Sequence, residues 1–260
     1  GTIDTAGGFS NGIYSTATMT TGLTVTSTSF TTRGTNSNGI YANGANIAAL
    51  AVTGGSMDIK GNNSNGIYAS IEPAKNVNIN GTSITTSGSG SNGIYARSGK
   101  VAVTGGSITT NGTYNNGILI ESTAYNGQAA DQVTIDGVTF NVNTQPGLAY
   151  NSQGSFNNGI YVGSERKIAS IKNSKFILND ALTAADANGH TKRVNNNIGI
   201  LVGDEADPTK AAEITTIEST TFDIKSTNAN STGDKGGTGI YMYHGTVNVG
   251  KETTFLGDSN

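Results

Sequence analysis

Short alternations of apolar and polar residues recur along this chain at nearly regular intervals. In LAVTGGSMDI, Leu50 and Val52 alternate with smaller or polar neighbours, and Met57 and Ile59 do so again beyond a Gly-Gly-Ser link. A period of two is typical of half-buried strands, and the Gly-rich link favours a tight turn. No stretch shows sustained helical periodicity. The pattern therefore predicts an all-β fold built from short strands.

A second phrase, Gly-Ile-Tyr or a close variant, sets the length of the repeat. It begins at Gly12, Gly39, Gly66, Gly93, Gly117, Gly159, Gly199 and Gly239. The first three steps are 27 residues each, and the later ones are 24, 42, 40 and 40. Each repeat supplies three short strands, at Gly-Ile-Tyr, at Val-x-Val and at Phe/Ile-x-Ile.

Three short strands cannot bury an apolar face alone, but stacked repeats can, because each strand then pairs in parallel with its counterpart one coil away. The sequence thus predicts a right-handed parallel β-helix, or β-solenoid, of about eight coils with three strands per coil. A propeller blade would need roughly 40–45 residues and four strands. We expect one domain over 1–260, with regular coils over 1–116 and coils carrying long insertions over 117–260.

Within the repeat, alternation places the isoleucine in the core and the residue after it outside. We expect that outer residue to form a stack along the rod, each pair contributing roughly 0.5–1.5 kcal/mol. The alternative is a platform for sugar rings, because aromatic faces suit apolar sugar surfaces. The predicted column contains Tyr14, Tyr41, Tyr68, Tyr95, Tyr161 and Tyr241, with leucine at positions 119 and 201.

The asparagine before each Gly-Ile forms a second predicted column. Its members are Asn11, Asn38, Asn65, Asn92, Asn116 and Asn158, and Ile198 and Thr238 interrupt the row. Stacked asparagine side chains can hydrogen-bond from coil to coil. Asn and Gly also tolerate a left-handed backbone, so we expect this pair to turn the chain at a corner. A structural role is favoured.

The second half departs from the regular pattern at one corner of the coil. Long insertions occupy NVNTQPGLAYNSQGSFNN, ILNDALTAADANGHTKRVNNN and DIKSTNANSTGDKGGT, and the segment DALTAADA suggests a short helix. Insertions on one face of a solenoid commonly form its binding surface, although drift at exposed turns is the alternative. The candidate binding residues are Pro146, Tyr150, Phe156, Asp180, Asp186, His190, Lys192, Arg193, Asp234 and Lys235.

Another corner carries the insertions ESTAYNGQAADQ and GDEADPTKAAE, and with them a candidate catalytic cluster. YVGSE and LVGDE align, which puts Glu165 and Glu205 one coil apart, with Asp204 in register with His244. Two carboxylates and a histidine could support acid/base hydrolysis or hold a cation. Basic residues follow Glu165 directly and these corners should be solvated, so exposed charge at a turn is favoured. We therefore expect no catalytic residues, no cofactor site and no metal site.

Composition narrows the function classes. The net charge is −3 with both signs thinly spread, which argues against nucleic-acid binding. Cysteine is absent, so the chain has no disulfide framework and no thiolate ligand or nucleophile. It shows no signal peptide and no apolar stretch near the roughly 18 residues of a membrane span. Because it starts at Gly1 without a methionine, we expect it to be a piece of a longer protein.

With NGIYA and VAVTGGSITTNG alternating, the chain resembles the passenger regions of autotransporter (type V secreted) adhesins of Gram-negative bacteria. The similarity spans all 260 residues and is one of repeat style, without a diagnostic catalytic motif. It implies an extracellular, surface-displayed β-helix, linked to the outer membrane through a barrel that lies outside this sequence. Its implied partners are cell-surface proteins or glycans of host or bacterial cells. It implies nothing about oligomeric state.

The sequence leaves three hypotheses for the function. The first is a non-enzymatic adhesin segment, in which regular coils form a rigid stalk and the insertions contact a cell-surface protein or glycan. The second is a polysaccharide hydrolase or lyase that uses Glu165, Asp204, Glu205 and His244. The third is a structural spacer without a ligand of its own.

Overall fold

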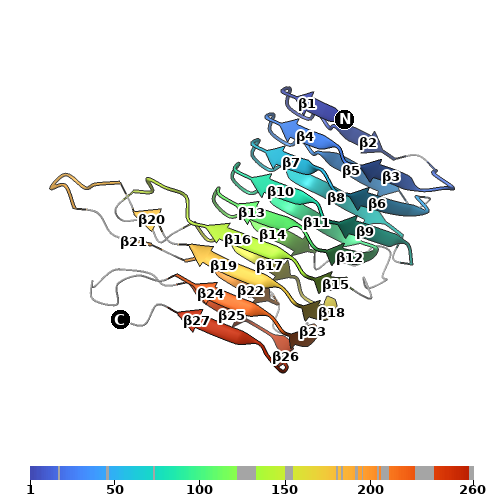
Figure 1. Cartoon of the computed structure of the whole chain (residues 1–260). Helices are drawn as coiled ribbons and strands as arrows, with labels where there is room; N and C mark the ends of the chain where they lie inside the picture. Colours follow the sequence, from blue (N-terminus) through green and yellow to red (C-terminus); the bar gives the residue numbers. More distant parts are fainter. Residues whose placement is uncertain are drawn as a thin grey trace.

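The computed structural model shows a stack of β-coils that runs from the N-terminus at one end to the C-terminus at the other (Figure 1). It describes residues 1–16, 18–44, 47–72, 74–121, 133–149, 155–179, 181–182, 184–190, 193–194, 196–203, 205, 211–225 and 237–257. Within these ranges all strands except one short antiparallel pair form three parallel sheets along the rod, which we call the first, second and third sheets. None of the described residues belongs to a helix long and apolar enough to cross a membrane.

Each sheet takes one strand from every coil. The first sheet contains β1 (Thr2–Thr5), β4 (Ser29–Thr32), β7 (Ser56–Ile59), β10 (Ser83–Thr86), β13 (Ser107–Thr110), β16 (Thr139–Asn143), β19 (Lys175–Asn179), β24 (Thr221–Ile224) and β27 (Thr254–Gly257). The second contains β2 (Ile13–Ser15), β5 (Ile40–Gly44), β8 (Asn65–Ile71), β11 (Asn92–Ser98), β14 (Asn116–Ile120), β17 (Asn158–Val162), β22 (Ile198–Val202) and β25 (Thr238–Met242). The third contains β3 (Leu23–Thr26), β6 (Ala49–Thr53), β9 (Asn76–Asn80), β12 (Lys100–Thr104), β15 (Val133–Asp136), β18 (Lys167–Lys172), β23 (Ala212–Glu218) and β26 (Gly245–Val249).

The register between coils follows the repeat in the sequence. In the second sheet Ile40 is opposite Ile67, and Tyr41 is opposite Tyr68. The shorter fourth step leaves the first sheet in register, because Ile84 still lies opposite Ile108. Differences in repeat length are absorbed at corners and at register shifts in the strands, as between Ala96 and Ser98 in β11. The prediction of a parallel β-helix with three strands per coil is confirmed.

The core is the space enclosed by the three sheets. Ile40 and Ala42 are fully buried, while Tyr41 between them is half-buried on the outer face, as the alternation predicts. In the first sheet the first apolar residue of each Phe/Ile-x-Ile strand forms an inner column. Toward the C-terminal end that column becomes a stack of parallel rings, Phe140, Phe176, Phe222 and Phe255, with centroids 4.6, 4.7 and 4.7 Å apart.

The predicted asparagine ladder is present. Each Nδ2 donates to the Oδ1 of the asparagine one coil earlier, at 2.8 Å in every pair. The pairs are Asn38–Asn11, Asn65–Asn38, Asn92–Asn65, Asn116–Asn92 and Asn158–Asn116. All the amide carbonyls therefore point toward the C-terminal end of the rod.

The expectation that this Asn-Gly pair adopts a left-handed backbone is wrong. The left-handed residues at that corner stand two positions earlier, at Asn36 (φ 56°) and Asn63 (φ 51°). The glycine is needed for a different reason, because a Cβ on Gly39 would lie 2.7 Å from the carbonyl oxygen of Gly66 in the next coil. Close approach of successive coils thus requires the glycine column.

A second, internal ladder lies beside the asparagines and was not predicted. From Ser37 onward, the residue before each ladder asparagine is fully buried, and its side-chain oxygen accepts a backbone N–H from the preceding coil. For example, Ser37 N donates to Ser64 Oγ at 2.9 Å, and Asn115 N donates to Asn157 Oδ1 at 2.8 Å. The column satisfies backbone groups that would otherwise be costly to bury.

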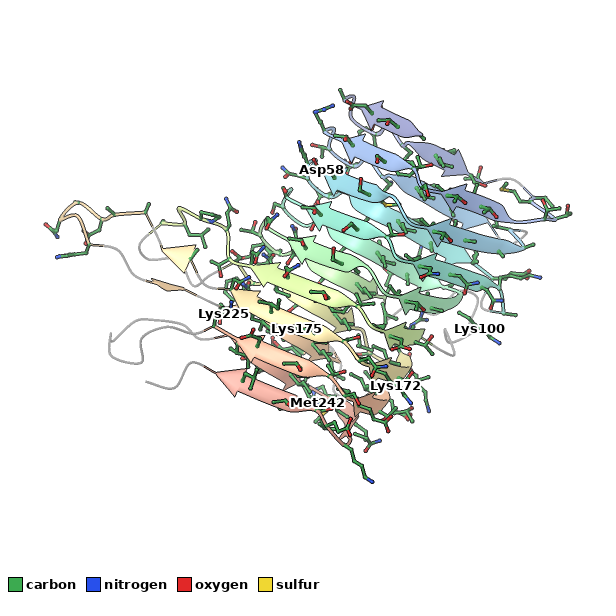
Figure 2. The ribbon with its side chains drawn as sticks, viewed as in Figure 1. Asp58, Lys100, Lys172, Lys175, Lys225 and Met242 are labelled. Atoms are coloured by element: carbon green, nitrogen blue, oxygen red, sulfur yellow. The ribbon has the colours of Figure 1, made fainter. Side chains whose placement is uncertain are left out.

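The long insertions leave from the corner between the first and second sheets, since they follow β16, β19 and β24, and the described parts of the first two lie on one side of the rod (Figure 1). One of them contains β20 (Ala181–Leu182) and β21 (Arg193–Val194), which pair antiparallel. The predicted short helix over DALTAADA is therefore wrong: its described part contributes a strand, because pairing across the insertion overrides the local helical preference. Charged side chains such as Lys172 and Lys175 lie on the outside of the rod (Figure 2).

Candidate functional site

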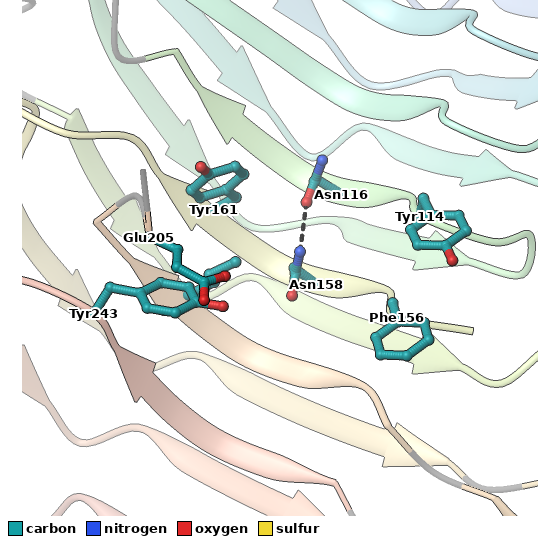
Figure 3. Close-up of a pocket in the computed structure, with 8 residues that line it drawn as sticks. Tyr114, Asn116, Phe156, Asn158, Tyr161, Glu205 and Tyr243 are labelled. Carbon is teal, nitrogen blue, oxygen red and sulfur yellow. Dashed lines mark hydrogen bonds between the residues drawn. The ribbon is translucent and has the colours of Figure 1, made fainter. Parts of the chain in front are cut away.

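A hollow of about 330 Å³ opens on the outer face of the second sheet, over β17 and β22 (Figure 3). This volume lies at the lower end of the roughly 300–1,000 Å³ typical of ligand pockets. Its lining is aromatic, amide and acidic: Tyr114, Asn116, Phe156, Asn158, Tyr161, Leu201, Glu205 and Tyr243. We refer to it as the aromatic hollow.

One wall of the aromatic hollow is a pair of rings at the corner that precedes the second sheet. Tyr114 and Phe156 stack with centroids 5.6 Å apart and planes 6° from parallel. Both have a left-handed backbone, with φ of 57° and 54°, at the position that Asn36 and Asn63 occupy in regular coils. Such a backbone is unfavourable for a bulky residue. The fold thus holds two rings where an asparagine would fit with less strain.

The floor is the end of the asparagine ladder. Asn158 donates through Nδ2 to Asn116 Oδ1, but the residue opposite it in the next coil is Ile198. The ladder therefore stops, and the Oδ1 of Asn158 accepts no hydrogen bond from the residues that the structure describes. A polarised acceptor faces the hollow as a result.

The opposite wall combines rings with one carboxylate. Tyr161 and Leu201 lie opposite each other in β17 and β22, and Tyr243 follows β25 in the next coil. Glu205 lies beside the ring of Tyr243 (Figure 3) and is exposed. Tyr243 also packs edge-on against Tyr241, at 4.9 Å between centroids. Of the described residues that line the hollow, Glu205 is the one carboxylate.

The structure does not bring the candidate catalytic residues together in this hollow. Glu205 lines it, whereas Glu165 is an exposed corner residue and His244 is half-buried, and neither is part of the lining. Glu165 has a left-handed backbone with φ of 61°. Asp204 lies outside the described residues. The part of the chain that the structure describes holds no group of three or more His, Asp or Glu residues that could bind a metal.

The residue after Glu165 differs from expectation. The sequence suggested a solvated charge, but Arg166 is only 1% exposed, and its Nη2 donates to the backbone oxygen of Arg97 at 3.4 Å. Lys167, one position on, is at the surface and pairs with Glu213 at 2.8 Å. The corner thus directs one basic side chain inward, along the rod, and the next outward.

The candidate binding residues in the insertions divide into three groups. Phe156 lines the aromatic hollow, and Pro146 is exposed. Asp186 and His190 form a local turn, in which Asp186 Oδ1 accepts the backbone N–H groups of Asn188 and His190, both at 2.8 Å. The remaining candidates lie outside the described residues or are described for their backbone alone. Those outside are Tyr150, Asp180, Lys192, Asp234 and Lys235; Arg193 is described only as part of β21.

The predicted tyrosine stack covers the first coils only. Tyr14, Tyr41 and Tyr68 lie parallel at 5.1 and 4.6 Å, but Tyr95 meets Tyr68 edge-on at 85°. The hydroxyl of Tyr95 donates to Glu121, and burial, followed by this hydrogen bond, raises its pKa. Beyond it, Leu119 and Leu201 separate Tyr161 and Tyr241 from other ring neighbours in the column.

Sequence reasoning placed Phe156 among the binding candidates but missed Tyr114 and Tyr243. The signal for Tyr114 is the phrase YNN, which matches FNN around Phe156, with the ring two residues before a ladder asparagine. Tyr243 has no such signal, because it lies outside the tyrosine column. Comparisons with protein-family models, with curated proteins and with solved structures give no match to this chain.

Proposed function

We propose that this chain is a segment of an extracellular adhesin, in which the coil stack is a rigid stalk and the insertions form the contact face. The observation that carries this proposal is the placement of the insertions. They follow β16, β19 and β24, which are neighbours in the first sheet, so three successive coils extend at the same corner. Solenoids commonly bind through insertions gathered on one face in this way.

The stalk role is supported by the ladders that join the coils. The asparagine column, the internal serine and asparagine column and the phenylalanine stack each cross several coils without a break. Such contacts link every coil to the next one, which makes bending between coils costly. The proposed setting is a bacterial cell surface, with a cell-surface protein or glycan as partner.

The structure indicates how to remove one insertion without removing a coil. Asn179 should stay, because its Nδ2 donates to Asn143 Oδ1 at 2.6 Å. Deleting residues 181–194 leaves five residues between Leu178 and Ile198, the same number as between Thr86 and Asn92 in a regular coil. The register makes the two corners equivalent, because Leu178, Val142, Thr110 and Thr86 lie opposite one another in succession.

The first test measures attachment of the bead-coupled chain to bacterial and epithelial cells, with and without residues 181–194. We expect the deletion to reduce attachment at least about tenfold while the β-sheet circular dichroism stays the same. A Lys60→Ser, Lys100→Ser double variant on the regular coils controls for loss of surface charge. Full attachment by the deletion variant removes this insertion from the contact face, and would favour a spacer.

Polysaccharide cleavage is not the function that the geometry favours. Glycoside hydrolysis ordinarily needs two carboxyl groups flanking the bond that breaks. The described lining of the aromatic hollow supplies Glu205 alone. A site of this composition suits binding without turnover.

A further inference from the structure

Three outer columns of the second sheet are interrupted at the same coil. At β22 the ladder asparagine is replaced by Ile198, and the column tyrosine is replaced by Leu201. The ring pair at the corner also ends, because the position two residues before Ile198 is Asn196. The aromatic hollow is therefore a gap at the coil where the asparagine ladder and the ring pair end and where the tyrosine column has a leucine, as it also has at Leu119.

The gap exposes aromatic surface on the side that faces β22. Tyr114 covers one face of Phe156, and both rings line the hollow. Tyr161 borders the gap from the same side, and Tyr243 borders it from the next coil. A flat ring of about one coil's thickness, roughly 4.8 Å, could lie in the gap and continue the stack.

The polar groups of the hollow decide what kind of ring fits. Asn158 offers the open carbonyl acceptor at the end of the ladder, and Glu205 offers a carboxylate. Both groups accept hydrogen bonds, so the ligand must bring donors. Both are also negative at the atoms that face the ligand, so an acidic ligand is disfavoured.

We propose that the aromatic hollow binds a neutral saccharide, with the C–H face of one pyranose ring against Phe156 and the rest of the saccharide extending toward Tyr161. Its hydroxyls donate to Asn158 Oδ1 and to the Glu205 carboxylate. Saccharides that carry a uronate or sialate group are rejected by Glu205. This proposal adds a ligand class to the proposed adhesin function. It rests on that function only for its biological setting.

The chain offers a matched pair of variants for testing the site. Phe156→Asn removes a wall of the hollow and installs the residue that Asn36 and Asn63 show to be suited to this backbone. Phe9→Asn makes the same change at the equivalent position of the first coil, where φ is 60° and the ring is 78% exposed. Both variants should fold, because each relieves a left-handed aromatic residue.

The experiment is saturation-transfer NMR with a panel of lactose, maltotriose, diacetylchitobiose, sialyllactose and tri-galacturonate. We expect at least one neutral sugar to bind and the two acidic ones not to bind. Phe156→Asn should lower the affinity for the neutral sugar about tenfold, because one stacked ring is lost. Phe9→Asn should leave the affinity unchanged.

A second variant tests the discrimination by charge. Glu205→Gln keeps a hydrogen-bond acceptor but removes the negative charge. We expect this variant to lower the affinity for the neutral sugar by only a few fold and to raise the saturation-transfer signal of sialyllactose. A merely structural role for Glu205 would leave the ratio between neutral and acidic sugars unchanged.

Several outcomes overturn the proposal: no binding of any neutral sugar, preference for an acidic sugar, or equal affinity in Phe156→Asn. Tighter binding of choline than of every sugar would also do so, because it would identify the rings as an ammonium cage. These outcomes are separate from those of the 181–194 deletion. Sugar binding can persist when the insertion proves dispensable, and cell attachment can depend on the insertion when the hollow binds no sugar.

Discussion

At the scale of single residues, glycine and asparagine serve two different needs at neighbouring positions. A left-handed backbone is required where Asn36 and Asn63 stand, and empty space is required where Gly39 and Gly66 stand. Sequence alone could not separate these roles, because both residue types tolerate turns. The separation needs the distance between coils, which is a property of the stacked fold.

This distinction predicts unequal costs for two glycine substitutions. In Gly66→Ala the new Cβ would lie 2.6 Å from the carbonyl oxygen of Gly93 and 2.9 Å from Ile84 Cγ2. We expect a loss of about 3 kcal/mol, because backbone from the next coil cannot move aside freely. In Gly81→Ala the φ is +63° but the Cβ meets nothing within 4 Å, so about 1 kcal/mol is expected. Chemical unfolding of both variants measures the difference; equal losses would contradict the close-approach explanation.

The turn around Asp186 makes a pH prediction. Its pKa is lowered, first by the backbone N–H of His190 and further by the N–H of Asn188 and the imidazole of His190. A lowered carboxyl pKa means that the turn is stabilised above the ordinary aspartate pKa and loses this stabilisation as pH falls through the lowered value. We expect the amide shifts of Asn188 and His190 to change together in an acid NMR titration. In Asp186→Asn this common transition should disappear, and its persistence would assign it to another group.

At the scale of the ladder, position along the rod should determine the cost of losing one member. Asn65 donates to Asn38 and accepts from Asn92, so Asn65→Ala breaks two side-chain bonds; Asn38 Oδ1 keeps the backbone N–H of Asn65, but Asn92 Nδ2 is left buried without its acceptor. A loss of about 2–3 kcal/mol is expected. Asn158→Ala breaks the single bond to Asn116 at the open end, so about 1 kcal/mol is expected. Thermal unfolding of the two variants gives the comparison, and a larger effect at Asn158 would contradict a ladder that ends there.

The strands were predictable because their evidence is local and repeated. Ile40, Tyr41 and their counterparts fix the inside and the outside of the second sheet through alternation alone. Arg166 was not predictable, since its partner Arg97 is 69 residues away in the sequence. The segment DALTAADA was mistaken for a helix because its strand partner, Arg193–Val194, lies across an insertion. Where the sequence departs from the repeat, contacts between distant residues determine the local structure.

The candidate site was predicted only in part, for a related reason. The binding candidates came from the insertions that interrupt the repeat, and one of them, Phe156, lines the hollow. The hollow itself arises because three columns change at one coil, which becomes visible once Asn158 lies opposite Ile198 and Tyr161 opposite Leu201. Of the four acidic and histidine candidates that align in the sequence, Asp204 lies outside the described residues, and of the other three only Glu205 lines the hollow.

At the scale of the whole molecule, the rod separates support from contact. Ladders run along its length (Figure 1), while insertions follow β16, β19 and β24 of three neighbouring coils at one corner. In this chain the last coil exposes about half of Met242, Val249, Phe255 and Leu256. Exposed apolar strand edges favour association between copies. Attachment measurements therefore need a preparation shown to be monodisperse by size-exclusion chromatography with light scattering.

The most direct measurement is attachment of the monodisperse chain to cells before and after deletion of residues 181–194. The account predicts that attachment falls at least about tenfold while circular dichroism and the unfolding temperature stay unchanged, because Asn179 and the five-residue corner of a regular coil are retained. Undiminished attachment by a folded deletion variant would contradict the assignment of this insertion to the contact face.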